Sequence, residues 1–247
     1  MTILNLSTNS KAYVFDEIQP IHTAIYLIET KKHLFLIDTY CGSGYLDEVK
    51  RDIATVNKPL YVINSHHHWD HIWGNCAFTN TPIISHTLCR IEEENNWDSQ
   101  YQENISFAKG DCTCTLPNIT FEERLVFEED GIELIHTPGH TLDSISVYDR
   151  NYKILYTGDN LELPIVYVQQ PDLTLYIHTL NRYLEMDVQK YTGSHELTVT
   201  RDGIIEIRNY LTSLKKGEIL SFENSYVQWV HDLNLNVLNK ATTSIIQ

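Results

Sequence analysis

The residues Ser-His-His-His-Trp-Asp-His at positions 65–71 decide the fold that we expect for this chain. The pattern His-x-His-x-Asp-His places four potential metal ligands in one short run, and few structural requirements would put so many imidazoles beside a carboxylate. The residues before it, Leu-Tyr-Val-Ile-Asn at 60–64, are mainly apolar and β-prone, so they predict a buried strand. We therefore expect a metal site on the loop at the end of that strand.

The spacing within the motif separates its histidines. If the chain stays extended for a few residues, alternation places His66 and His68 on one side and turns His67 away. Asp70 and His71 follow on the turn, close enough to serve a second ion beside the first.

Length and composition fit an ordinary globular protein. The 247 residues are enough for one large domain with a sizeable core, and no repeat or linker suggests a boundary, so we predict a single domain over residues 1–247. With 42% hydrophobic and 21% charged residues, wholesale disorder is excluded. No apolar run approaches the roughly 20 residues that span a bilayer, so we expect no membrane insertion.

Charge and cysteine content restrict the partners and the compartment. The net charge is −15, with 18 Lys and Arg against 33 acidic residues, whereas nucleic-acid binding requires clustered positive charge. We therefore expect no nucleic-acid partner. Five cysteines at irregular spacings suggest no disulfide framework, and residues 1–15 lack a secretory signal, so the expected location is cytoplasmic.

The rest of the sequence predicts alternating strands and helices. Two apolar runs predict a hairpin, and residues 45–56 have helical spacing. Residues 87–118 begin as a helix to about Trp97 and then lose their pattern, so we expect a lid or an irregular insertion there, with a surface excursion of no function as the alternative. The other expected elements are the hairpin strands 21–29 and 33–39, helix 72–78, strands 82–85, 120–127, 132–136, 144–148 and 153–157, and helices 172–184 and 201–216.

Three further segments share one format, a strand that runs into a small-residue turn and presents a ligand. They end in Pro-Gly-His at 138–140, Gly-Asp at 158–159 and Gly-Ser-His at 193–195. In each, glycine allows a tight turn that points the next polar residue off the strand end. Four strand ends thus supply seven candidate metal ligands: His66, His68, Asp70, His71, His140, Asp159 and His195.

The other histidines lack this context. His136 lies within a predicted strand, so we expect it in the core or on the surface. The same interpretation applies to the histidines outside the motifs, which are His22, His33, His86, His178 and His231.

On these residues, the sequence resembles the metallo-β-lactamase fold superfamily, whose five motifs fall here in order between residues 38 and 195. The resemblance implies an α/β fold, an αββα four-layer sandwich with two mixed sheets packed face to face and helices outside. It implies that Asp38, at the end of a strand, supports the site without binding metal. It also implies that one ion is held by His66, His68 and His140, the other by Asp70, His71 and His195, with Asp159 as the bridge.

The ligand chemistry suits two divalent metal ions, with zinc expected and iron or manganese as substitutes. Two ions about 3.5 to 4 Å apart lower the pKa of a shared water toward neutrality, so a metal-bridging hydroxide is available as a nucleophile. Asp70 is the candidate catalytic residue that accepts and carries the proton. We therefore predict a binuclear metallo-hydrolase that cleaves a small ester, thioester, lactone or amide.

The resemblance leaves the branch of the family open. Asp159 stands where zinc-dependent β-lactamases usually carry cysteine or serine, and the complete ligand set resembles glyoxalase II and the lactone hydrolases. Lactonases often place a tyrosine shortly after the bridging aspartate, whereas Tyr167 is the first tyrosine here. The alternatives are a phosphodiesterase of the same fold and an iron-dependent oxygenase or reductase.

The substrate pocket and the assembly follow from the same reasoning. We expect a small-molecule substrate, with residues 161–167 beside the metals. Trp69 or Trp73 helps to shape the pocket, or else both only pack the loop. The sheet-edge loops and the tail at 221–247 are where we place the contact of a homodimer.

Overall fold

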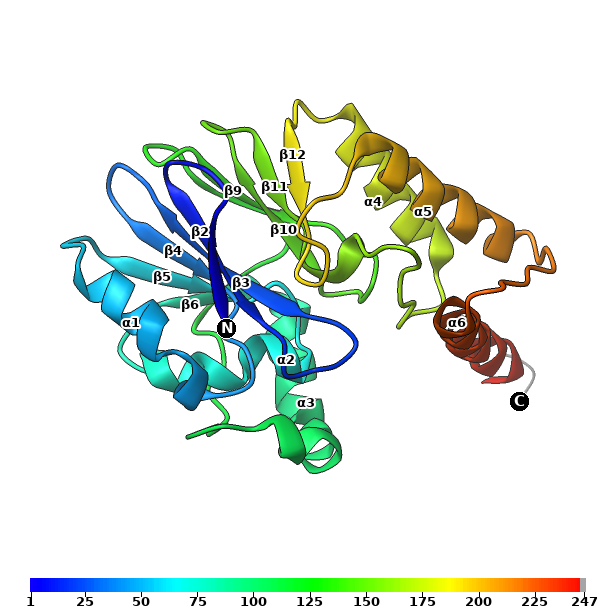
Figure 1. The fold of residues 1–247 in the computed structure, drawn as a ribbon, viewed down its shortest axis with the longest axis horizontal. Coiled ribbons are helices and arrows are strands. Elements are labelled where there is room, and N and C mark those ends of the chain that lie inside the picture. The colour runs from blue at the N-terminus through cyan, green and yellow to red at the C-terminus, as the bar shows by residue number, and fades with distance from the viewer. Residues whose placement is uncertain (245–247) are drawn as a thin grey trace.

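The computed structural model describes the backbone of residues 1–244 and the side chains of residues 1–240. Two stacked β-sheets form its centre (Figure 1). The first sheet has the strand order β1-β2-β3-β4-β5-β6-β7 and the second the order β12-β11-β10-β9-β8. The strands are β1 Thr2–Asn5, β2 Ser10–Phe15, β3 Thr23–Glu29, β4 Leu34–Ile37, β5 Leu60–Ile63, β6 Ile83–His86, β7 Ile119–Phe121, β8 Arg124–Phe127, β9 Ile132–His136, β10 Ile145–Asp149, β11 Ile154–Tyr156 and β12 Lys190–Thr192.

Both faces of the first sheet are buried because its central strands are apolar on both sides. Along β2, Ala12 and Val14 pack between the two sheets, whereas Tyr13 and Phe15 pack on the outer face. The same alternation continues in β3 and β4. Such continuous apolar runs are typical of strands that are covered on both faces.

Helices cover the outer face of each sheet, and this confirms the expected αββα sandwich. Against the first sheet lie α1, α2 and α3, and against the second lie α4 and α5 (Figure 1). Their bounds are α1 Asp47–Ala54, α2 Trp69–Ile72, α3 Thr87–Asn104, α4 Leu173–Glu185 and α5 Arg201–Lys215, and short 3₁₀ turns occur at η1 Ser43–Tyr45, η2 Trp73–Phe78, η3 Ile105–Phe107 and η4 Gly158–Asn160.

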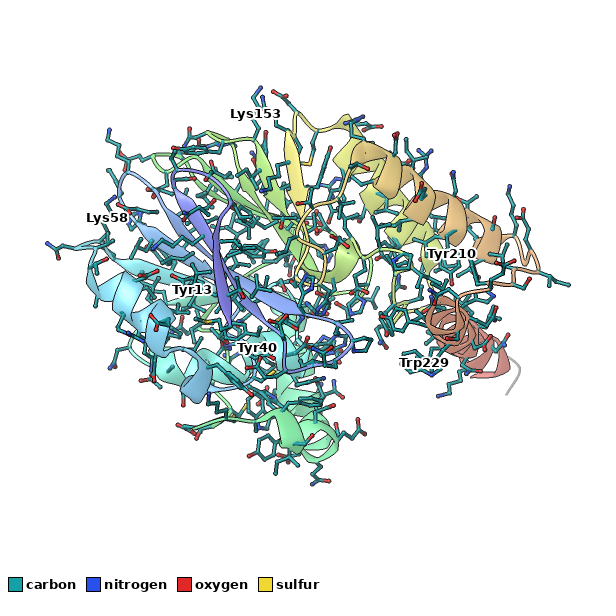
Figure 2. The ribbon with its side chains drawn as sticks, in the orientation of Figure 1. Tyr13, Tyr40, Lys58, Lys153, Tyr210 and Trp229 are labelled. Carbon is teal, nitrogen blue, oxygen red and sulfur yellow. The ribbon has the colours of Figure 1, made fainter. Side chains whose placement is uncertain are left out.

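The last helix, α6 Ser225–Ser244, packs beyond α5. Figure 2 shows Tyr210 between these two helices, where its hydroxyl accepts a hydrogen bond from Asn234 Nδ2 at 3.0 Å. Within residues 1–244, no helix has the length and apolar character needed to span a bilayer. The dimer contact placed on the tail at 221–247 stays a prediction, and residues 245–247 of that tail lie outside the described part of the chain.

The structure differs from the sequence expectation in two places. The run 120–127 is two strands, β7 in the first sheet and β8 in the second, separated by the exposed pair Glu122 and Glu123. The stretch 87–118 is more regular than expected, because α3 continues past Trp97 to Asn104 and η3 follows it. The function of this stretch as a lid stays a prediction.

One edge of the sandwich collects the strand ends that precede the candidate ligands. β4 and β5 run parallel, as do β11 and β12. β9 has the same direction as β11 because both are antiparallel to β10. The loops after β5, β9, β11 and β12 therefore leave the sheets at carboxyl ends that can meet at one edge.

Candidate metal centre

The loop after β5 is fixed by Asp38, a buried residue just beyond the end of β4. Its Oδ1 accepts a hydrogen bond from the backbone N–H of Ser65 at 2.7 Å. Its Oδ2 accepts from Ser65 Oγ at 2.7 Å and pairs with His71 Nδ1 at 2.9 Å. Because Asp38 takes the Nδ1 proton of His71, the lone pair of His71 Nε2 is left for the centre. This arrangement is the supporting one that the family resemblance implies for Asp38.

Three imidazole nitrogens converge in a first group. His66 Nε2 and His68 Nδ1 are 3.0 Å apart, and His140 Nε2 lies 3.1 Å from His68 Nδ1. Around a tetrahedral zinc ion with Zn–N bonds of about 2.0–2.1 Å, neighbouring nitrogens would be about 3.3 Å apart. The spacing of this group therefore fits one metal ion.

Asp70, His71 and His195 form a second group. Asp70 Oδ2 is 3.4 Å from His71 Nε2 and 3.5 Å from His195 Nε2. These distances also match neighbouring ligands of a single ion. The short helix α2 begins at Trp69, so it carries Asp70 and His71 on one turn immediately after the loop of the first group.

Asp159 lies between the two groups. Its Oδ2 is 3.1 Å from His195 Nε2 and 3.3 Å from His71 Nε2 in the second group. The same oxygen is 3.5 Å from His66 Nε2 and 3.8 Å from His140 Nε2 in the first group. The structure thus brings together all seven candidate ligands, with Asp159 in the position that a bridging carboxylate would take.

Two buried polar atoms of the centre have no hydrogen-bond partner among the described residues, namely His71 Nε2 and Asp159 Oδ1. Buried polar atoms are nearly always paired, so each of these needs a ligand that the protein does not supply. Imidazole nitrogen and carboxylate oxygen are donors that zinc, iron and manganese accept. The donor set therefore fits divalent metal ions.

The outer nitrogens of His140 and His195 are held by backbone carbonyls. His140 Nδ1 pairs with the Tyr167 carbonyl oxygen at 2.9 Å, and His195 Nδ1 pairs with the His22 carbonyl oxygen at 2.7 Å. Asn160, which the sequence did not single out, accepts a hydrogen bond from the His140 backbone N–H at 2.8 Å. Such contacts fix which ring nitrogen faces a metal site.

Two glycines make the ligand turns. Gly158 has a φ of +56°, and a Cβ at this position would lie 3.1 Å from the Ser65 Cβ. At Gly193, a Cβ would lie 2.6 Å from the carbonyl oxygen of Leu161. The left-handed φ of Gly158 and the close backbone approach at Gly193 both favour glycine, so these residues let Asp159 and His195 reach the centre.

Charge interactions distinguish the two groups. Burial lowers the pKa of His66, His68 and His140 below the usual histidine range, and that of His68 falls to about 3. Their nitrogens are therefore neutral at pH 7, as metal binding requires. Burial also disfavours the charged form of His195, but the carboxylates around it, beginning with Asp159, outweigh burial and raise its pKa to about 10. The second group is thus the one that attracts positive charge most strongly.

Glu162 is a carboxylate at the centre that the sequence analysis missed. It is buried, and its carboxylate lies within 4.8 Å of the ligand atoms of Asp159 and His195. Burial raises its pKa to about 8, with the neighbouring carboxylates adding to the shift and His195 opposing it. A single glutamate within the apolar run 161–168 was the available signal in the sequence.

A cavity of about 550 Å³ opens beside the first group, lined by His68 and by residues from α3. Its size is that of a small-molecule site. The lining contains three carboxylates, Glu92, Glu103 and Asp143, and several amide side chains but no Lys or Arg; the amide residues include Asn96, Gln100, Gln169 and Gln170.

The two tryptophans have different positions. Trp69 lines the cavity, and its backbone N–H donates to Gln100 Oε1 at 2.9 Å. Trp73 is fully buried and packs against Trp69 and Tyr101, so it supports the loop. Tyr167 directs its hydroxyl away to Tyr226, at 3.2 Å, and residues 161–167 do not line this cavity.

Two further histidines occupy separate places. His67 turns away from both groups and pairs with buried Asp143 through Nδ1 at 2.9 Å, as the alternation argument predicts. His136 stands at the end of β9 and stacks on His86, with ring centroids 3.9 Å apart. Neither belongs to the groups that could hold an ion among the described residues.

Comparison with known proteins gives three kinds of match. The model of the metallo-beta-lactamase superfamily matches residues 18–195. An N-acyl homoserine lactonase of a Bacillus species is 42% identical over 87 residues, 33% of this chain and 29% of that protein. An N-acyl homoserine lactonase of Bacillus thuringiensis is 30% identical over 131 residues, 47% of each chain. The chain therefore spans less than half the length of these lactonases.

A solved structure resembles this chain over most of its length. The metallo-beta-lactamase from Pontibacter korlensis superimposes with a TM-score of 0.65 and 21% sequence identity, over 85% of this chain and 98% of that one. At this identity, the likeness concerns the fold alone.

Proposed function

This chain belongs to the metallo-β-lactamase superfamily. From that membership we propose that it is a hydrolase that holds two divalent metal ions, with zinc as the expected metal. We also propose that it cleaves a small ester or lactone. Hydrolysis is the coarse activity that the family match and the lactonase relatives support. The number and identity of the ions and the ester or lactone substrate are the parts that we add.

The observation that carries the proposal is the position of Asp159. A single carboxylate oxygen, Oδ2, lies 3.1 to 3.8 Å from four imidazole nitrogens that belong to two different groups. One ion would need only one such group. A shared oxygen between two complete groups favours two ions that sit side by side.

The residues of the centre divide the work. When bound, the two ions would supply Lewis acidity that lowers the pKa of a shared water and polarises a carbonyl group. Asp70 places one carboxylate oxygen within 3.5 Å of His71 and His195, and as the candidate proton acceptor it can pass the proton on to the leaving group. Asp38 keeps His71 oriented throughout.

The cavity beside His68 supports an uncharged or positively charged substrate. Glu92 and Glu103 face it, and no Lys or Arg lines it, so an anionic phosphodiester or a glutathione conjugate would find no partner there. The amide side chains of the lining can donate and accept hydrogen bonds from a neutral polar substrate. Among neutral electrophiles we place lactones and esters first because the curated relatives above are lactonases.

Two measurements test the proposal. Protein purified without added metal should contain close to two ions per chain, mainly zinc. A panel of lactone, ester, thioester, β-lactam and phosphodiester substrates should show the highest kcat/KM for a lactone or ester. Asp70→Asn should lower that value by about 10²–10⁴-fold because it removes the proton acceptor and weakens a ligand of the second ion. Asp98→Asn, the same change at an exposed position of α3, is the matched control.

The outcomes separate the alternatives. Iron alone, with no hydrolysis of any member of the panel, would replace the proposal with a redox enzyme. Preference for the phosphodiester would overturn the substrate assignment. Full activity in Asp70→Asn would overturn the assigned function of that carboxylate.

A further inference from the structure

We propose that Glu162 is an eighth metal ligand, a carboxylate that binds the second ion beside Asp159 and His195. The inference rests on the proposed metal centre and deepens it. Glu162 stands three residues after Asp159, just beyond η4, on the segment that leads from β11 toward α4. Its carboxylate and the ligand atoms of Asp159 and His195 all lie within 4.8 Å of one another.

The protein supplies no other partner for this carboxylate. Glu162 is 6% exposed, and among the described residues no hydrogen bond or ion pair reaches its side chain, whose oxygens are not fully enclosed. Its neighbours in the sequence are apolar, and Leu161 and Ile165 are themselves buried. Buried carboxylates are normally paired with a cation or coordinate a metal, and a metal ion is the partner that this position offers.

The extra ligand makes the two metal positions unequal. The first group has three imidazoles and the shared oxygen of Asp159, which suits tetrahedral zinc. Glu162 would add a carboxylate to the second position on the side of Asp159 and His195, and a set richer in oxygen suits a harder ion with a higher coordination number, such as manganese or iron. Two divalent ions and three carboxylates also leave a net charge of only about +1 at the centre. A centre with this low positive charge attracts anions only weakly, and the cavity likewise has no cationic side chain in its lining to bind an anion.

The experiment is a metal titration of Glu162→Gln, in which the side chain keeps its size and loses its charge. Metal-free wild type and variant are titrated with zinc and with manganese in competition with a chromophoric chelator. Glu206→Gln, the same change at an exposed position of α5, is the control. We expect wild type to bind two ions. Glu162→Gln should keep its affinity for the first ion and lose about 10–100-fold in affinity for the second, with the larger loss for manganese.

Two further readouts do not depend on activity. With cobalt in the second position, the visible absorption should intensify in Glu162→Gln because the coordination number falls. The rise in melting temperature on adding metal should be smaller in the variant than in wild type, although the metal-free variant should be at least as stable as metal-free wild type, since Gln removes a buried ionisable group.

The outcomes are distinct. Equal affinity of wild type and Glu162→Gln for both ions overturns the ligand proposal and leaves the proposed function standing. Failure of wild type to bind two ions overturns the proposed function, and this inference with it. A variant that is less stable than wild type without metal assigns Glu162 to the fold and also overturns the proposal.

Discussion

Asp38 offers the sharpest test of how the centre is held, because it contacts the metal loop without belonging to either group of ligands. Its two oxygens accept from the Ser65 backbone N–H, the Ser65 hydroxyl and His71 Nδ1. In Asp38→Asn, one oxygen becomes an NH₂ group that can only donate. Whichever way the amide turns, its NH₂ meets either the Ser65 N–H or the His71 N–H, so at least one bond is lost and two donors oppose each other.

The magnitude follows from these contacts. A hydrogen bond to a charged group contributes about 1.5–3 kcal/mol, and a buried donor without an acceptor costs a similar amount. We therefore expect a total loss of about 2–4 kcal/mol, divided between the free energy of folding and the free energy of metal binding. Where the NH₂ faces His71, the ring changes tautomer and protonates Nε2, the atom that faces the second group. We therefore expect about 10–100-fold weaker binding of the second ion and little change for the first.

The affinity for each ion is measured by titrating the metal-free protein with metal in competition with a chelator. Urea unfolding of the metal-free protein measures the loss in the free energy of folding. Ser65→Ala removes the contacts of the hydroxyl with Asp38 and with His66 Nδ1 but leaves the pair of Asp38 with His71, so it should lose about 1–2 kcal/mol of stability and keep the second ion. If Asp38→Asn is folded and binds both ions within twofold of wild type, the carboxylate does not orient His71 and the reasoning is refuted.

Three further predictions concern buried polar groups that are not metal ligands. Glu93 is buried without a hydrogen bond, and burial raises its pKa from 4.5 to about 8. Its ionisation therefore destabilises the fold increasingly as pH rises from 4.5 toward 8. In urea titrations, Glu93→Leu should increase the free energy of unfolding by about 3 kcal/mol at pH 7, with a smaller gain at pH 5. Burial opposes ionisation of Asp143, but its bonds from His67 prevail and lower its pKa from 3.8 to about 2. Its contribution of about 2 kcal/mol to the free energy of unfolding is therefore complete above pH 4 and is lost as pH falls toward 2. A difference in the free energy of unfolding between wild type and Asp143→Asn that stays constant from about pH 5 to 3 would contradict this. Asn234 accepts from the Val168 N–H and donates to the Val166 carbonyl oxygen, so Asn234→Leu should cost about 2–4 kcal/mol by thermal unfolding, and an unchanged melting temperature would show that the segment does not need this support.

The sequence predicted those parts of the fold that local pattern determines. The hairpin expected at 21–29 and 33–39 is β3 and β4, and the helix expected at 201–216 is α5, within one or two residues at most ends. These segments are uniformly apolar or strictly periodic, so their neighbours in the sequence suffice to identify them. The run 120–127 was misjudged because its passage from one sheet to the other at Glu122 and Glu123 depends on tertiary packing.

The candidate site was predictable to a similar extent and for a related reason. The seven ligands stand next to glycines or within one dense motif, and such turns are visible in the sequence. Glu162 and Asn160 carry no such mark, since a lone glutamate or asparagine usually lies on the surface. Only the convergence of β9, β11 and β12 brings these two beside the ligands.

The distance along the chain between the ligand loops determines when metal can enter the protein during its synthesis. A ribosome that adds roughly 5–20 residues per second takes roughly 6–26 s to pass from His66 to His195. During that time the segment 66–71 offers four imidazoles and a carboxylate without the partners that β9, β11 and β12 supply later. Copper binds such nitrogen ligands more tightly than zinc does, so the availability of each ion in the cell decides which one the nascent segment captures. The same gene expressed in copper-rich and in copper-poor medium should therefore yield protein with different metal content.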